Sequence, residues 1–377
     1  MQDFFITKIS IKKVRHLENI DIELSPNEKK HLIITGKNGS GKTSLLLGLN
    51  NVVTDMRWEL DSSGQFIANS EFDVRKSGIK VFGSVPSYDT SLMHSVNIFE
   101  LLRADRKLEL EIPKSIEKVE LRTMRSKMFI KFLLYLNYQM MFAKTNNNSE
   151  EAEKIEKWFS LFLNALREVF DCPMLELKHD SKDLSYKIIM PEREPFGLNE
   201  MADGYSAFLH IVMELMMKME NQASMTYDVP GIVFIDEIET HLHIELQKRV
   251  LPFLIKMFPR IQFIVTTHSP FIITSISNAV VYDLEKKIAV EDMSAYSYEA
   301  VIKHYYDIDM YSIEASKQFD IYKSFINKQT LSPDEMEQFV SAIAYLKQIP
   351  AGAAEELVYA FREMEIARRQ KFHDKAE

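Results

Sequence analysis

Residues 31–47 decide the fold of this chain, and they read HLIITGKNGSGKTSLLL. After the leading histidine, the first residues are apolar or β-branched, as expected of a buried central strand. A glycine-rich loop follows, and the last residues continue into a helical pattern. The loop matches the phosphate-binding pattern G-x-x-x-x-G-K-[ST] without a mismatch, in the strand–loop–helix context that the pattern requires. A chance glycine-rich turn is the alternative, and the correct flanking elements argue against it.

The chemistry of such a loop follows from its backbone and two side chains. Glycines let backbone N–H groups point at phosphate oxygens, and the following helix adds the positive end of its dipole. Lys42 can reach the β- and γ-phosphates, and the Thr43 hydroxyl can ligate Mg²⁺. We therefore predict that the chain binds ATP with Mg²⁺ through one run of residues: Gly36, Lys37, Asn38, Gly39, Ser40, Gly41, Lys42, Thr43 and Ser44.

A second apolar strand ends in two carboxylates. Ile232 to Ile235 lead directly into Asp236 and Glu237. Parallel strands bring their carboxyl ends to one edge of a sheet, so these acids are expected at the phosphate site. Asp236 would hold Mg²⁺ through its water shell, and Glu237 would polarise the attacking water as general base. The alternative, a strand that ends in two solvated acids, is disfavoured by the phosphate-binding loop upstream.

A histidine follows another apolar strand, Ile261 to Val265, in the run TTHSP. At the end of a sheet strand, His268 could touch the γ-phosphate or the attacking water. A lone histidine is more often a surface or capping residue. The position after a second sheet strand favours the functional interpretation, so the predicted catalytic residues are Lys42, Glu237 and His268.

Together, the phosphate-binding loop, the IDE strand end and the TTHSP strand end resemble the ABC-type AAA-family ATPases of the SMC, RecF and OLD group. The stretch 235–271 is similar to PtuA-type ATPases of Septu and retron-associated anti-phage defence. The resemblance covers roughly the first 50 residues and then 198–276. It implies an α/β P-loop NTPase fold of ABC type, with a mostly helical insertion and a helical C-terminal tail. It also implies a slow ATPase that regulates a separate effector protein, for which a nuclease is the favoured candidate.

The same resemblance implies a signature segment, which opens a helix and contacts the γ-phosphate held by the partner subunit. Its best match comprises Asp203, Gly204, Tyr205 and Ser206. Ala202 stands where the family usually has serine, so one hydroxyl contact is missing unless Ser206 replaces it. The alternative is an ordinary helix cap by Asp203. A signature that acts across subunits implies a homodimer or higher oligomer.

Other family positions are less clear in this sequence. The resemblance places a dimer-crossing loop at Glu239 to Leu242, and it offers Gln65 or Tyr88 for the Q-loop. His241 and His243 do not share a helix face at their spacing, which argues against a metal site. Arg15 and His16 either approach the base or ribose, or are plain surface residues.

Basic residues are frequent between residues 103 and 131. A basic helix face could bind nucleic acid, whereas a solvated face with local Glu–Lys pairs is the alternative. The basic run at residues 368–371 ends a helix, where positive charge is common for dipole reasons alone. After Glu299, only about 75 residues remain, too few for a large nuclease domain. We therefore expect any nuclease in a separate protein.

The alternation of elements predicts four regions. Residues 1–95 and 196–295 would form the two parts of the ATPase core, residues 96–195 a mainly helical insertion, and residues 296–377 a helical tail. Alternating strands and helices imply a parallel sheet covered by helices. Two strands, near 174–178 and 184–190, are expected to lead from the insertion back toward that sheet.

Composition limits the setting. The net charge is −9, which argues against non-specific coating of nucleic acid. The single cysteine, Cys172, excludes an internal disulfide and a cysteine zinc site. The sequence lacks a signal-peptide pattern and an apolar run long enough to span a membrane, so we expect a cytoplasmic protein. Two other functions remain open: DNA repair or chromosome maintenance of the SMC/RecF kind, and an ATP-bound scaffold with rare turnover.

Overall fold

The computed structural model describes residues 4–55, 58–60, 66–69, 78–84, 97–106, 108–113, 126–222, 228–306, 311–328, 330–350 and 354–373. The chain divides into two compact units, Met1–Tyr296 and Ser297–Glu377.

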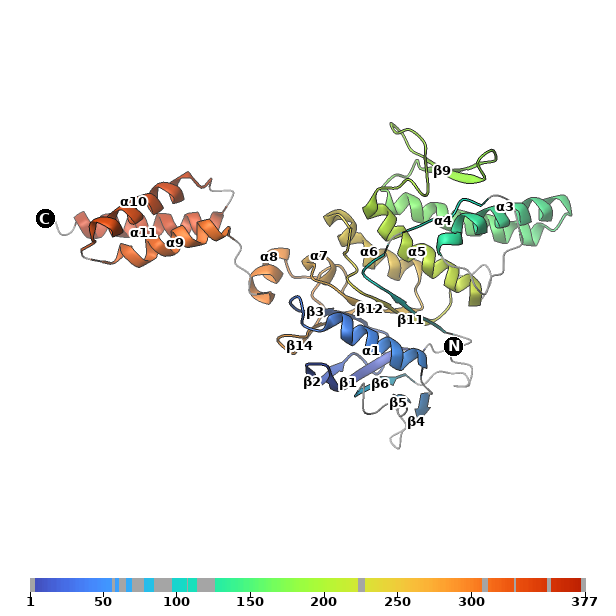
Figure 1. Cartoon of the computed structure of the whole chain (residues 1–377), viewed down its shortest axis with the longest axis horizontal. Helices are drawn as coiled ribbons and strands as arrows, with labels where there is room; N and C mark the ends of the chain where they lie inside the picture. Colours follow the sequence, from blue (N-terminus) through green and yellow to red (C-terminus); the bar gives the residue numbers. More distant parts are fainter. Residues whose placement is uncertain are drawn as a thin grey trace. The chain divides into compact units, whose positions relative to one another are not determined.

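A six-stranded sheet forms the centre of the first unit (Figure 1). Five neighbouring strands run parallel, as the sequence predicts, and β14 adds an antiparallel edge. Every residue of β3, β11, β12 and β13 is buried, which explains their continuous apolar runs. In spatial order the strands are β14 (Ile288–Glu291), β13 (Ala279–Asp283), β3 (His31–Thr35), β12 (Ile261–Thr266), β11 (Gly231–Ile235) and β7 (Ile98–Leu102).

The edge strand β7 lies in the range for which a mainly helical insertion is expected. Its sequence, IFELL, is short and only partly buried, and a short apolar run does not distinguish strand from helix. It pairs in parallel with β11 along its whole length. The approach is close, because a Cβ on Gly231 would stand 2.3 Å from the carbonyl oxygen of Ile98.

A second, antiparallel sheet packs on the same unit. Helix α1 (Lys42–Asp55) lies between the two sheets, and side chains from both sheets and from α1 form one buried apolar core. The strands are, in spatial order, β2 (Leu17–Glu23), β1 (Ile6–Val14), β6 (Ile79–Gly83), β5 (Phe66–Asn69) and β4 (Trp58–Leu60). In β1, Ile9 and Ile11 are buried, whereas Lys8 before them and Ser10 between them are only half-buried.

One buried amide joins the two sheets. The side chain of Gln262, on β12, accepts a hydrogen bond from the N–H of Ile6 at 2.7 Å. Its Nε2 donates to the carbonyl oxygens of Ile6, at 3.0 Å, and Lys30, at 2.7 Å. Gln262 is fully buried, and both of its bonds to Ile6 are buried, while the bond to Lys30 is partly buried.

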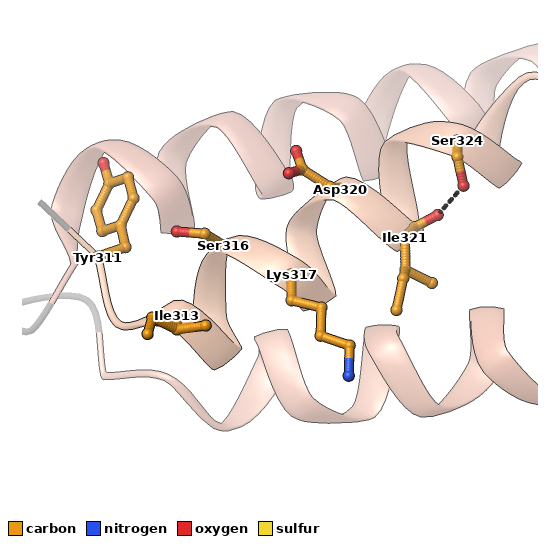
Figure 2. Close-up of a pocket in the computed structure, with 7 residues that line it drawn as sticks. All are labelled: Tyr311, Ile313, Ser316, Lys317, Asp320, Ile321 and Ser324. Atoms are coloured by element: carbon orange, nitrogen blue, oxygen red, sulfur yellow. Dashed lines mark hydrogen bonds between the residues drawn. The ribbon is translucent and has the colours of Figure 1, made fainter. Parts of the chain in front are cut away.

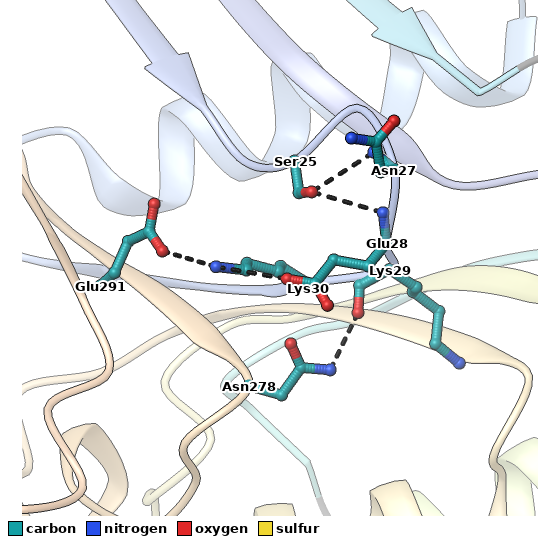
Figure 3. Close-up of polar contacts among 7 residues, drawn as sticks. All are labelled: Ser25, Asn27, Glu28, Lys29, Lys30, Asn278 and Glu291. Atoms are coloured by element: carbon teal, nitrogen blue, oxygen red, sulfur yellow. Dashed lines mark hydrogen bonds and ion pairs between the residues drawn. The ribbon is translucent and has the colours of Figure 1, made fainter.

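The start of β3 is anchored at the edge of the sheet opposite the phosphate-binding loop (Figure 3). Asn278 donates to the carbonyl oxygen of Lys29 at 2.9 Å, and Lys30 pairs with Glu291 of β14 at 2.5 Å. Ser25 accepts from two backbone N–H groups and closes the turn before the strand. These contacts fix the strand that carries the loop.

Two long helices, α5 (Asp203–Gln222) and α6 (Ile244–Met257), lie on the face of the parallel sheet opposite α1 (Figure 1). The short helix α7 (Pro270–Ile273) follows β12, and the Ser269 side chain caps it by accepting from the N–H of Phe271.

The insertion is a helical hairpin followed by a small sheet of its own. After η4 (Ser126–Met128), helices α3 (Phe129–Thr145) and α4 (Ser149–Val169) pack around an aromatic core that includes Trp158 and Phe162. Strands β8 (Glu176–Asp180) and β9 (Ser185–Ile189) pair with β10 (Phe196–Gly197). Among the described strands these three pair only with one another, so they add no strand to the main sheet.

The second unit is helical, as expected for the tail. Its elements are α8 (Tyr298–Ala300), the π-helix η5 (Val301–Tyr305), α9 (Ile313–Ile326), α10 (Pro333–Gln348) and α11 (Glu355–His373). Tyr322 is fully buried at the centre, and its hydroxyl donates to the buried carboxylate of Glu365 at 3.0 Å. A shallow pocket runs along α9, with Ile313 almost fully exposed at one end (Figure 2).

Candidate functional site: the carboxyl edge of the parallel sheet

The phosphate-binding loop connects β3 to α1 and is shaped by its own backbone. Gly36, Gly39 and Gly41 have φ values of 137°, 82° and 97°, a region that side chains with a Cβ rarely adopt. Lys42 is buried, and its Nζ donates to the carbonyl oxygens of Gly36, at 2.9 Å, and Lys37, at 3.1 Å. The lysine side chain is therefore folded onto its own loop.

Neighbouring elements hold the rest of this loop. A ring nitrogen of His16, at the tip of the β1–β2 hairpin, lies 3.1 Å from the carbonyl oxygen of Ser40. His16 thus contacts the loop backbone, while Arg15 is exposed beside it with φ 53°. Lys37 is exposed and pairs with Glu285 at 2.9 Å. Thr43 is exposed and Ser44 half-buried at the start of α1.

The acidic turn, Asp236–Leu242, begins where β11 ends. Asp236 is buried, and its Oδ1 accepts from the hydroxyl of Thr266 at 2.6 Å. The same hydroxyl oxygen accepts from the N–H of Glu237 at 2.7 Å. Glu237 has φ 44°, and its carboxylate is half-buried, with Thr240 donating at 3.4 Å. Thr266 therefore links the carboxylate of Asp236 and the backbone of Glu237 to the end of β12.

Sequence reasoning missed the residue that holds this turn from the other side. Arg106 is 6% exposed and follows β7 by four residues. Its two terminal nitrogens donate to the carbonyl oxygens of Asp236, at 2.7 Å, and Glu237, at 2.8 Å, and one of them also reaches Arg103 at 2.9 Å. The hypothesis of a basic surface is wrong for Arg106. In the sequence, the only sign of this role is that an arginine closely follows β7, a strand that the sequence pattern does not predict.

His268 stands at the end of β12, beside the acidic turn. Its backbone N–H donates to the carboxylate of Glu239 at 2.5 Å. The half-buried imidazole has a pKa below its ordinary value, chiefly because of burial and then because of the nearby Lys42. A neutral ring at physiological pH can donate or accept a proton, which suits either predicted role.

Burial and the nearby acids act on the pKa of Lys42 in opposite directions. Burial lowers the pKa of Lys42, and the charges of Glu237, Glu239, Asp236 and Asp283 oppose that shift. The structure thus brings the predicted catalytic side chains from the ends of β3, β11 and β12 into one electrostatic neighbourhood.

The predicted signature segment opens α5, and Asp203 is the first residue of that helix. Gly204 packs against the acidic turn of its own chain, because a Cβ there would stand 3.1 Å from the carbonyl oxygen of His241. Tyr205 stacks on Phe170 at 4.3 Å and 11°, and so joins the helix to the end of α4. Ser206 is half-buried, and its N–H donates to the carbonyl oxygen of Ala202.

Several predictions fall outside the described residues. Gln65 and Tyr88, the Q-loop candidates, do so, as do Lys107 and residues 114–125 of the basic stretch. Among the described residues, no group of three or more His, Cys, Asp or Glu side chains could hold a metal by itself. In the same residues, no helix is long and apolar enough to span a membrane.

This edge, with a glycine loop and lysine on one strand and paired acids on another, is what phosphate-handling ATPases of the α/β class require. The profile of the AAA ATPase domain family matches residues 67–273, more than half of the 377 residues. The chain belongs to the AAA ATPase domain family. Within this AAA ATPase chain, the matched range includes the acidic turn and His268.

Relatives of this AAA ATPase chain carry related names. It is 26% identical over 288 residues to the Septu protein PtuA of Bacillus mycoides (strain KBAB4), covering 71% of this chain and 38% of the relative. It is 30% identical over 144 residues to the Retron Ec83 probable ATPase of Escherichia coli, covering 35% and 26%. The chain thus spans well under half the length of either relative. The solved SMC head domain from Thermotoga maritima is 12% identical, with a TM-score of 0.41, covering 74% of this chain and 94% of that one.

Proposed function

We propose that this chain binds ATP with Mg²⁺ and hydrolyses it at the carboxyl edge of its parallel sheet. The observation that carries the proposal is the convergence of Lys42, Asp236, Glu237 and His268 from three strand ends, with their charges acting on one another. Lys42 would bind the β- and γ-phosphates. Glu237 would take the proton of the attacking water, and His268 would orient that water or the γ-phosphate.

Orphaned polar atoms support nucleotide binding at this place. Ser40 Oγ, Glu239 Oε2 and His268 Nε2 are buried without a hydrogen-bond partner among the described residues. Burying such atoms unpaired costs about 1–3 kcal/mol each, so a polar ligand that satisfies them gains affinity. Thr43 and Asp236 supply the hard oxygen ligands that suit Mg²⁺, which when bound would neutralise phosphate charge.

A second subunit would complete the site. The segment from Asp203 to Ser206 offers backbone N–H groups and a helix N-terminus to the γ-phosphate bound by a partner copy. Ala202 provides no hydroxyl there, so closure of the dimer would rely on Gly204 and Ser206. The resemblance to dimer-forming ATPases motivates this arrangement.

The cellular role we propose is an ATP-responsive subunit of an anti-phage defence complex that controls a separate effector. The support is similarity to proteins named Septu PtuA and retron ATPase. A DNA-repair ATPase is the rival, and salt-dependent DNA binding by the purified chain alone would favour it. A scaffold that binds ATP without turning it over is the second rival, and a steady-state phosphate-release assay excludes or supports it.

The deciding experiment replaces the general base. Glu237→Gln should keep ATP affinity and lower the rate of phosphate release by about 100- to 10,000-fold, the usual contribution of general acid–base catalysis. Glu245→Gln, an exposed carboxylate on α6 that pairs with Lys248, is the matched control and should hydrolyse at the parental rate. Parental turnover in Glu237→Gln would show that the base lies elsewhere.

A further inference from the structure

Arg106 contacts the backbone of the acidic turn through both of its terminal nitrogens. Its guanidinium spans two consecutive carbonyl oxygens, those of the residues that carry the predicted metal-binding and catalytic carboxylates. The backbone continues the same link, because the N–H of Asp236 donates to the carbonyl oxygen of Leu102 at 2.8 Å. The end of β7 and the segment that follows it therefore form three hydrogen bonds with the backbone of the acidic turn.

Only a planar, two-pronged donor makes this grip. The fixed fork of an arginine reaches both carbonyl oxygens at once, whereas a lysine ammonium is a single point on a flexible stem. The turn that it grips is under strain, since Glu237 has a positive φ without being glycine. A strained backbone conformation persists only where contacts with the surrounding structure hold it in place.

The charge of Arg106 also faces the acids of the site. Burial lowers the pKa of Arg106 to about 10, against the opposing charges of Glu239, Asp236, Glu237 and Asp105. The guanidinium therefore stays protonated at neutral pH, which eases repulsion among the carboxylates. Helix α5 carries the half-buried His210, whose pKa is lowered first by burial, with the charge of Arg106 adding to the shift and that of Glu214 opposing it.

We propose that Arg106 is a positioning residue for ATP hydrolysis, which holds the acidic turn so that both carboxylates face the phosphate-binding loop. The inference rests on the proposed ATPase function and deepens it. Arg106 does not touch the substrate. It acts through the backbone of Asp236 and Glu237.

The test compares rate with affinity. Arg106→Lys keeps the charge and loses the fork, so kcat should fall about 10- to 100-fold, as for other residues that orient active-site ligands. Affinity for ATP, measured by isothermal titration, should stay at the parental value. Arg167→Lys is the matched control, because Arg167 also donates to a backbone carbonyl, that of Leu175 in the insertion, away from the acidic turn. It should leave turnover unchanged.

A double variant separates positioning from general support of the fold. In the Glu237→Gln background, Arg106→Lys should lower the residual single-turnover rate less than it does in the parent, because one of the two carboxylates that Arg106 positions is gone. An equal fold-loss in both backgrounds, or parental turnover in Arg106→Lys, would overturn the inference. Where the lysine variant does not fold, Arg106→Gln, which keeps a planar donor, is measured with the same outcomes. Parental turnover in Glu237→Gln would instead overturn the proposed function.

Discussion

The phosphate-binding loop and the acidic turn lie at the same edge of one sheet, yet they are held in different ways. The loop is held mainly by itself: the ammonium of Lys42 bonds carbonyl oxygens five and six residues away. The acidic turn is held from afar, by Arg106 at a separation of 130 residues and by Thr266 at 29 and 30. A local structure can be recognised from a short motif, whereas the turn exists only once the strands have assembled.

The largest expected effect breaks the self-contained loop. Lys42→Ala removes a charged donor worth about 3 kcal/mol to bound phosphate, which corresponds to about a 100-fold loss of ATP affinity. Lys37→Ala changes an exposed lysine of the same loop, which pairs with Glu285, and should bind ATP nearly as the parent does. Titration calorimetry measures the ATP affinity of both variants. Equal losses of affinity would mean that Lys42 contributes no more to ATP binding than Lys37 does.

The second effect breaks the distant support of the turn. Thr266→Val keeps the shape but leaves the N–H of Glu237 and the carboxylate of Asp236 without this partner. We expect about 2 kcal/mol lower stability against urea, together with slower ATP turnover. Thr274→Val, which removes a bond to the carbonyl oxygen of Pro270 within α7, is the control and should not slow turnover. An unchanged rate in Thr266→Val would mean that the turn holds its shape without that hydroxyl.

The third effect concerns the strand beneath the loop. His31 Nδ1 accepts from the N–H of Phe263 at 3.0 Å, and burial lowers the pKa of His31 from 6.5 to about 3. The folded state thus keeps the ring neutral while the unfolded chain protonates it. The stability from this residue is present above about pH 6.5 and decreases toward pH 3, by about 1.4 kcal/mol per pH unit. Urea unfolding at pH 7 and pH 5 should show this loss in the parent and a smaller one in His31→Asn.

The smallest effect tests the contact between the turn and the signature helix. A glycine-to-alanine change inside a helix normally stabilises it by about 1 kcal/mol. At Gly204 the new Cβ would press on the carbonyl oxygen of His241 at 3.1 Å, so Gly204→Ala should bring no gain or a slight loss. A full gain in unfolding free energy would mean that helix α5 and the acidic turn do not press on each other.

Much of the fold follows from local pattern. The strands at His31–Thr35, Gly231–Ile235 and Ile261–Thr266 are runs of buried apolar residues, and the glycine loop is decided by a motif. Their parallel arrangement follows from alternation with helices. The family, too, follows from the strand ends.

The rest depends on distant pairing. Strand β7 is a short, half-buried edge that only its partner β11 defines. The pairing of β8 and β9 with β10 depends on a hairpin that the sequence does not distinguish from a return to the main sheet. Arg106 looks like one basic residue among many until the turn that it grips is in place. The roles assigned to the site residues remain predictions.

Gln262 has a mechanical consequence. Two hydrogen bonds to Ile6, each worth about 1 kcal/mol, tie the antiparallel sheet to the strand that carries Thr266, and a third, to Lys30, ties that strand to the segment before β3. A tilt of one sheet against the other would therefore have to break both bonds to Ile6. His16 lies at the tip of the antiparallel sheet, and His268 follows a strand of the parallel sheet. The Gln262 link therefore restrains movement of the two histidines relative to each other.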